Sequence, residues 1–186
     1  ARALLGRGFS VIVRPHPEYT KRYHARWESL QQRYASWSRD DIYFEQDFST
    51  SDSVYDADVL VTDWSSIACE FSFTTMKPCV FVDTPMKVTN PDWEELGIEP
   101  ADLAIRNQIG ASLAMEELPR LGDVVEDMVA RPEAWRNRIE EVRSRMIYHK
   151  GRGARSPAHI CLTACWRSRA TGPSRRPEHP GWIGLA

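Results

Sequence analysis

Residues 59–68, V-L-V-T-D-W-S-S-I-A, combine residue types that can bind an anion. An apolar run ends at Asp63, the hydroxyl residues Ser65 and Ser66 follow, and an apolar helix pattern begins at once. A strand that passes directly into a helix brings free backbone N–H groups and the positive end of the helix dipole together, and phosphate binds at such points. The simpler interpretation is that Asp63 or Ser65 only caps the helix. The segment therefore predicts either a phosphate site or a helix cap.

Two further polar clusters also follow apolar runs. Arg14 and His16 belong to R-P-H-P, and Asp83 and Lys87 belong to D-T-P-M-K. Ligands of an open parallel sheet bind outside the carboxyl ends of its strands, so we expect all three clusters to share one edge. Guanidinium, imidazole, hydroxyl and ammonium groups on one rim suit a diphosphate. Alternatively, His16 is a rigid turn residue, Asp83 a turn former and Lys87 a solvated charge.

The hydrophobic pattern predicts the elements that position these clusters. Short continuous apolar runs are typical of parallel strands buried on both faces, and helical periodicity lies between them. The predicted strands cover residues 9–13, 42–44, 59–62 and 79–82, with a weaker one in 104–109. The predicted helices cover residues 23–37, 49–56, 67–73, 90–97, 121–130 and 132–146. Trp27 and Trp37 are expected in the core. The predicted fold class is α/β with a parallel sheet flanked by helices.

Composition indicates a globular chain with one folded domain. The 186 residues are 42% hydrophobic and 27% charged, which is ordinary for a soluble protein. No apolar run approaches the ~20 residues that span a bilayer, and the start does not read as a signal peptide. The first eight residues are typical of the end of a helix with a glycine terminator. We therefore expect the chain to be a fragment of a longer protein.

Charge is divided unevenly along the chain. Residues 150–186 carry seven Lys/Arg and one acidic residue, a net of +6, whereas the remainder carries 17 basic and 25 acidic residues, a net of −8. An acidic body is a poor binder of nucleic acid, so no nucleic-acid partner is expected. Periodicity fails from Ser156 onward. The expected division is a folded domain over residues 1–156 and an irregular, disordered basic tail over residues 157–186.

The four cysteines do not indicate disulfides or a metal centre. Cys69 and Cys79 fall in a helix and a strand, where they are expected to be buried small hydrophobes. Cys161 and Cys165 have histidines nearby, but their spacing matches a zinc site poorly. We expect no metal, no other cofactor and a reducing, cytoplasmic location.

Several nucleotide-binding motifs do not occur. The loop after residues 9–13 is rich in proline and contains no G-x-G-x-x-G, so a dinucleotide fold is unsupported. No G-x-x-x-x-G-K-[ST] is present, which excludes a P-loop NTPase. A receiver-type phosphoacceptor at Asp63 would need an acidic cluster where the chain has R-P-H-P.

Three segments together resemble a known family. R-P-H-P, D-A-D-V-L-V-T-D-W-S-S-I-A-C-E-F-S-F and K-P-C-V-F-V-D are similar to the C-terminal half of the CDP-glycerol glycerophosphotransferases, the teichoic-acid-type polymerases and primases. The resemblance spans residues 9–156 and includes a closing G-R-G-A-R-S segment at 151–156. It implies a Rossmann-like domain that forms the C-terminal half of a GT-B fold and holds the CDP-activated donor. The N-terminal half, with the acceptor contacts and a candidate general base, would lie outside this chain.

The resemblance also implies roles for particular residues. His16 matches a histidine beside the donor phosphates and is the candidate catalytic residue. Ser65 and Ser66 match phosphate-binding serines, and Asp63 and Glu70 match the acids beside them. The expected donor-phosphate contacts are Arg14, Asp63, Ser65, Ser66 and Lys87, and the expected supporting residues are Glu70, Asp83 and Arg106. Trp64 stands where the family usually has tyrosine, and the D-T-P-M-K loop differs from the teichoic-acid polymerase form.

The function that follows is transfer of glycerol phosphate from CDP-glycerol, or a related CDP-polyol, to a hydroxyl of a cell-wall or capsule polymer or a lipid-linked acceptor. The full-length enzyme would work in the cytoplasm, peripherally on the inner face of the membrane, and the fragment alone would be inactive. Two alternatives stay open. The chain could be the C-terminal half of another GT-B enzyme, a UDP- or GDP-sugar transferase or a 2-epimerase, or it could be a non-catalytic nucleotide-binding module.

Overall fold

A computed structural model describes residues 1–46, 49, 52–85, 92, 95, 97 and 99–148. The chain divides into two compact units, Ala1–Arg145 and Met146–Ala186, and the first is described below. Four predicted features lie outside the described residues: Lys87, most of the helix predicted over residues 90–97, the closing segment at 151–156 and the predicted tail. No helix in the described ranges is long and apolar enough to cross a bilayer.

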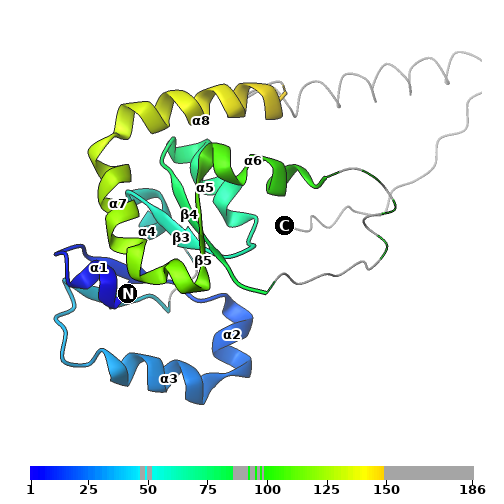
Figure 1. Ribbon diagram of the computed structural model, residues 1–186. Helices are drawn as coiled ribbons and strands as arrows, with labels where there is room; N and C mark the ends of the chain where they lie inside the picture. The colour runs from blue at the N-terminus through cyan, green and yellow to red at the C-terminus, as the bar shows by residue number, and fades with distance from the viewer. Residues whose placement is uncertain are drawn as a thin grey trace, which may run out of the picture. The chain divides into compact units, whose positions relative to one another are not determined.

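Helices and strands alternate along the first unit (Figure 1). The N-terminal part comprises α1 (Arg2–Leu5), β1 (Val11–Val13), α2 (Pro17–Arg22), α3 (His24–Arg33), β2 (Ile42–Phe44) and α4 (Asp52–Asp56). The remainder comprises β3 (Leu60–Thr62), α5 (Ile67–Thr75), β4 (Cys79–Asp83), α6 (Ala101–Ile109), β5 (Gly110–Ala114), the 3₁₀ helix η2 (Met115–Arg120), α7 (Leu121–Ala130) and α8 (Pro132–Met146). This order confirms the α/β prediction.

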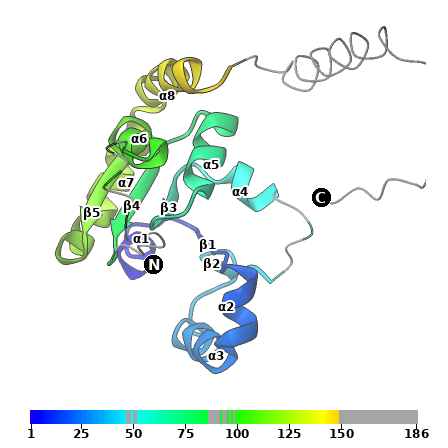
Figure 2. The same ribbon diagram turned by 90° about the vertical axis from the view of Figure 1, so that its right-hand side faces the viewer.

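The strand pairs in the described residues are all parallel, in two sheets (Figure 2). One sheet pairs β1 with β2, and the other has the order β3-β4-β5. A Rossmann-like class is confirmed by these parallel strands and their flanking helices. However, β1 and β3 belong to different sheets, so the polar clusters that follow them do not share the edge of one continuous sheet.

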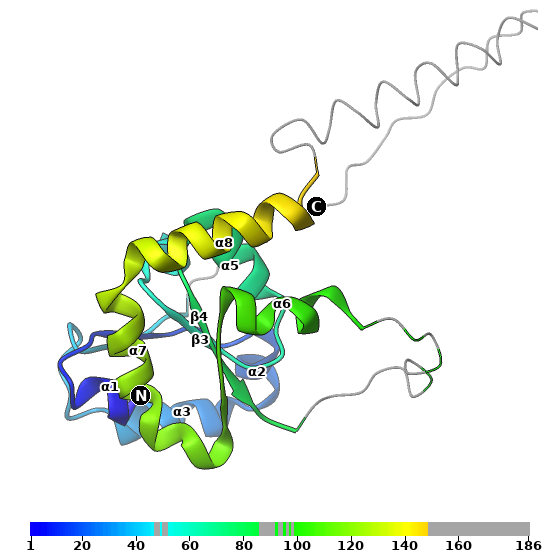
Figure 3. The same ribbon diagram turned by 45° about the horizontal axis from the view of Figure 1, so that its top comes forward.

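Strand β4 is the centre of the larger sheet and is covered on both faces, as its continuous apolar sequence predicts. Cys79 and Phe81 pack with buried residues of α5, α6 and α8, whereas Val80 packs with buried residues of β5 and α7. Figures 1 and 3 show α5, α6 and α8 on one side of the strands and α7 on the other. The loop that follows β4 therefore starts from the buried centre of the larger sheet, and the loop that follows β3 starts from the strand beside it.

The weak strand predicted within residues 104–109 is wrong. That stretch is the second half of α6, and the strand begins one residue later, at Gly110. Ile105 and Ile109 are four residues apart and both are buried, which is the spacing of one helix face. The six-residue window therefore contained part of a helical repeat and none of the strand.

The prediction that Trp27 and Trp37 share the core is half confirmed. Trp27 is 4% exposed and packs edge-on against Phe44, with ring centroids 5.5 Å apart. Trp37 is 39% exposed, because α3 ends at Arg33 and the residues beyond it leave the helical repeat.

The two described cysteines are free thiols. Cys79 is fully buried in β4, as expected, and desolvation raises its pKa to about 12, so it is a neutral core residue at ordinary pH. Cys69 is only partly buried, and its pKa is raised by burial and by the neighbouring charges of Asp102 and Glu70. Neither thiol has the electropositive setting of a reactive cysteine.

Candidate functional site

The junction between β3 and α5 leaves several hydrogen-bond donors unused. Ser66 is the N-cap of α5, has helical backbone angles and makes no side-chain capping bond. Ser65 Oγ accepts a long hydrogen bond of 3.5 Å from the N–H of Ile67. Within the described part of the chain, the N–H groups of Ser65 and Ser66 donate to no other residue. The helix-cap interpretation therefore has only the long bond to Ile67 in its favour.

The same junction has the chemistry of an anion site. Asp63, Ser65 and Ser66 are all exposed, and the nine-residue helix α5 starts directly after them. Two N–H groups and two hydroxyls at the start of a helix favour bound negative charge. The carboxylate of Asp63 opposes an anion at this place, so the arrangement favours a phosphate that faces the serines.

A buried arginine lies behind this junction. The Arg106 guanidinium stacks on the ring of Trp64 at 3.8 Å and on the ring of Phe81 at 4.7 Å, measured from Cζ to the ring centroids. Its Nη2 donates to Asp83 Oδ1 at 2.7 Å. The indole Nε1 of Trp64 donates to the carbonyl of Thr84 at 2.7 Å. These contacts tie the loops after β3 and β4 to helix α6.

A second polar cluster lies at the carboxyl ends of β1 and β2. Arg14 follows β1 and donates through Nη1 to Glu45 Oε2 at 2.8 Å and to Ser53 Oγ at 3.2 Å. Ser53 Oγ donates to the same carboxylate oxygen at 2.6 Å. Glu45 is a buried acid, and its N–H bonds to the carbonyl of Val13, which extends the β1–β2 ladder by one residue. The positive charge of Arg14 is therefore partly compensated inside the protein.

His16 begins helix α2. It is the N-cap, and its Nδ1 accepts a hydrogen bond of 3.2 Å from the N–H of Glu18. Pro17 occupies the first helical position, which proline favours. An accepting Nδ1 carries no proton, so in the neutral ring the proton lies on Nε2. His16 is exposed, and Nε2 is the nitrogen that the cap does not use.

The structure divides the predicted site residues into two groups. Asp63, Ser65, Ser66, Asp83 and Arg106 lie around the carboxyl ends of β3 and β4, whereas Arg14 and His16 follow β1 in the other sheet. Glu70 is an exposed residue of the first turn of α5. Lys87 lies outside the described residues.

Sequence reasoning missed Glu45 and Ser53 as partners of Arg14. Glu45 could have been found, because it directly follows a predicted strand, as Arg14 does, and the ladder pairs Val13 with Phe44. Residues that follow paired parallel strands meet at the same edge. Ser53 had no comparable signal, since it approaches Arg14 only through the fold of α4.

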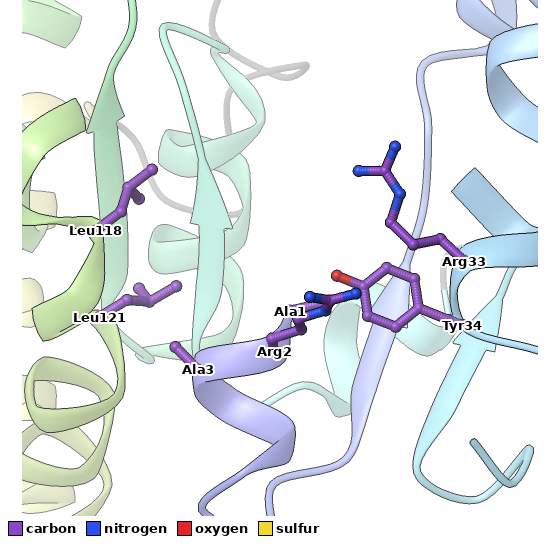
Figure 4. Close-up of a pocket in the computed structure, with 7 residues that line it drawn as sticks. All are labelled: Ala1, Arg2, Ala3, Arg33, Tyr34, Leu118 and Leu121. Atoms are coloured by element: carbon purple, nitrogen blue, oxygen red, sulfur yellow. The ribbon is translucent and has the colours of Figure 1, made fainter. Parts of the chain in front are cut away.

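A cavity of about 570 Å³ lies away from these residues (Figure 4). Figure 4 shows Arg33 and Tyr34 on one side of it and Leu118 and Leu121 on the other, with residues 1–3 between them. None of the predicted site residues that the structure describes lines it. Among the described residues, no group of three potential metal ligands occurs.

Parallel strands with flanking helices define a Rossmann-like α/β domain. Residues 1–95, just over half of the 186-residue chain, match the family described as CDP-Glycerol:Poly(glycerophosphate) glycerophosphotransferase. The chain belongs to this glycerophosphotransferase family, which confirms the family predicted from its motifs. Comparison with curated proteins and with solved structures gives no match. The matched region contains every predicted site residue except Arg106.

Proposed function

We propose that this chain is the donor-binding domain of a CDP-glycerol, or related CDP-polyol, glycerophosphotransferase. The observation that carries the proposal is the free start of α5, where Ser65 and Ser66 keep unused N–H groups inside the region that matches the family. Helix N-termini of this kind hold phosphate through backbone donors and the helix dipole. Ser65, Ser66 and Lys87 would contact the donor diphosphate, and Arg14 and His16 would approach the same donor from the end of β1 in the other sheet.

The proposed reaction is the displacement of CMP at the donor β-phosphate. An acceptor hydroxyl gives its proton to a general base, which the second half would supply, and its oxygen forms a new bond to that phosphorus. The bond from the phosphorus to the bridging oxygen breaks, and CMP leaves with the electron pair. The chain's donors would position the diphosphate and stabilise its negative charge, which is the main catalytic contribution in phosphoryl transfer. His16 is the candidate catalytic group, because Nε2 is not used by the cap.

The rest of the enzyme is also part of the proposal. A second Rossmann-like half would complete a GT-B architecture and supply acceptor contacts, with a wall, capsule or lipid-linked polymer as acceptor at the inner face of the membrane. Residues 1–156 would form the donor domain, and residues 157–186 would not contribute to it. Because the chemistry would take place between two halves, we expect the chain alone to bind nucleotide and to transfer little or no glycerol phosphate.

Calorimetric titration of the chain with CDP-glycerol, CMP, UDP and GDP tests the donor assignment. We expect CDP-glycerol and CMP to bind and UDP and GDP to bind far more weakly. A preference for UDP or GDP would support a sugar-transferring GT-B enzyme instead, and no binding of any nucleotide would contradict the proposal. Release of CMP from CDP-glycerol with an added acceptor measures transfer. Rapid transfer by the chain alone would show that no second half is needed.

Replacing both Ser65 and Ser66 with alanine removes the two hydroxyls and keeps the backbone N–H groups. The loss of the hydroxyl hydrogen bonds to the diphosphate is expected to weaken CDP-glycerol binding about tenfold or more, since hydrogen bonds to charged groups contribute about 1.5–3 kcal/mol. The melting temperature should change little, because Ser66 makes no capping bond and Ser65 only a long one. Ser38→Ala is the matched control, since the Ser38 hydroxyl bonds Asp41 at 2.6 Å in the loop before β2. A double variant that melts much earlier but binds normally would restore the helix-cap interpretation.

A further inference from the structure

Arg106 is an unusual core residue. Its side chain is 8% exposed, and its guanidinium contacts two aromatic rings on the side of β4 where the larger core cluster packs. Taking a guanidinium out of water is costly unless every donor finds a partner. The ion pair with Asp83 satisfies Nη2, but the buried Nε has no hydrogen-bond partner among the residues that the structure describes. A hydrophobic side chain of similar volume would fill this space without that cost.

The contacts of Arg106 join three segments that are far apart in the chain. It belongs to α6, its ion-pair partner Asp83 ends β4, and its closest ring, Trp64, lies in the loop between β3 and α5. Trp64 is held twice, by its face against the guanidinium and by its Nε1 donating to Thr84. The indole therefore has little freedom to turn.

Trp64 stands between Asp63 and Ser65, so its side chain anchors the loop that carries the unused donors. If the indole moved, the backbone on either side would move with it, and the N–H groups of Ser65 and Ser66 would no longer be held in place. A ligand would then have to order the loop on binding, which lowers affinity.

We propose that Arg106 is a positioning residue that holds Trp64 and thereby presents the Ser65 and Ser66 donors to the phosphates of a nucleotide-activated donor. The proposal rests on the donor-binding function proposed above. Arg106 does not touch the donor, because it is buried behind the junction. It acts through the indole, and its flat guanidinium suits that role, since a planar cation stacks on a ring as the ammonium of lysine cannot.

Two variants of the 186-residue chain separate positioning from packing. Arg106→Met keeps the volume but removes the charge and the planar donor group, and Arg106→Lys keeps the charge but removes the flat stacking surface. Both are expected to weaken CDP-glycerol and CMP binding about tenfold, equivalent to about 1.4 kcal/mol. Arg138→Met is the matched control, because Arg138 also stacks on a tryptophan, Trp135, at 5.2 Å and lies on α8.

Hydrogen exchange of residues 60–68, measured by mass spectrometry without ligand, gives a readout that is independent of nucleotide binding. We expect faster exchange there in both Arg106 variants and unchanged exchange there in Arg138→Met. Unchanged exchange in folded Arg106→Met or Arg106→Lys would overturn the positioning role. Arg106 variants with a lower melting temperature but normal nucleotide affinity would also overturn the positioning role. If the unmodified chain binds no nucleotide while the Arg106 variants exchange faster, the loop is positioned as inferred and the proposed function is what fails.

Discussion

Gly110→Ala is expected to destabilise the domain by about 4 kcal/mol or more, the range reached only by severe core changes. Gly110 begins β5 and pairs with Cys79 in the parallel ladder. A Cβ at this position would overlap the carbonyl oxygen of Cys79 and lie 2.8 Å from its carbonyl carbon and 3.0 Å from Phe81 Cε2. The backbone of Gly110 is extended, so the obstacle is the close approach of β4 and not the dihedral angles.

Urea unfolding of Gly110→Ala measures this loss, with Gly122→Ala as the control. A Cβ at Gly122 would mainly meet the side chain of Arg7, which can rotate away, although the carbonyl of Ala3 is also near at 3.0 Å. Alanine also favours the α7 helix by about 1 kcal/mol over glycine, so we expect Gly122→Ala to remain close to the unmodified stability. If Gly110→Ala unfolded at the same urea concentration as the unmodified chain, the β4–β5 pairing would be wrong.

The second large effect is expected at His16. Two substitutions there separate its role as the N-cap of α2 from its proposed contact with the donor phosphates. Asparagine accepts a capping bond as well as any residue, whereas alanine cannot. His16→Asn should therefore keep the stability of α2, and His16→Ala should lose about 0.5–2 kcal/mol. If the imidazole contacts the donor phosphates as proposed, both variants should bind CDP-glycerol about tenfold or more weakly, since a charge-assisted hydrogen bond is lost.

Calorimetry with CDP-glycerol and thermal melting of the same samples test this pair. Thr20→Ala serves as the control, because the Thr20 hydroxyl donates within α2 to the carbonyl of Pro17 at 2.9 Å and has no proposed contact with the donor. Normal binding by His16→Asn would make His16 a capping residue only.

Much of the fold could be predicted because its signals are local. The strand over residues 42–44 and the helix over residues 121–130 have the predicted bounds. The helix after Ser66 and the parallel strands β3 and β4 on either side of it follow from a continuous apolar run, a polar break and a second run. Each of these patterns lies within about a dozen residues, the length over which periodicity is informative.

Features that depend on distant residues could not be predicted in this way. The burial of Arg106 requires Trp64 and Phe81 to meet α6, and nothing near Arg106 in the chain indicates that contact. The separation of β1 from β3 likewise depends on packing between segments and not on the pattern of either strand. Trp37 shows that a local pattern can also mislead. Its spacing from Trp27, Leu30 and Tyr34 fits one helix face, but α3 ends at Arg33 and Trp37 is exposed.

The ion pairs of Arg14 with Glu45 and of Arg106 with Asp83 also bear on how fast a ligand can be captured. A paired charge has almost no field beyond a few ångströms in salt solution, so neither arginine can guide an anion from a distance. The donors at the start of α5 are dipoles, which act only near contact. These groups would therefore add little to the rate at which a dianionic ligand arrives, and they would act mainly on how long it stays bound.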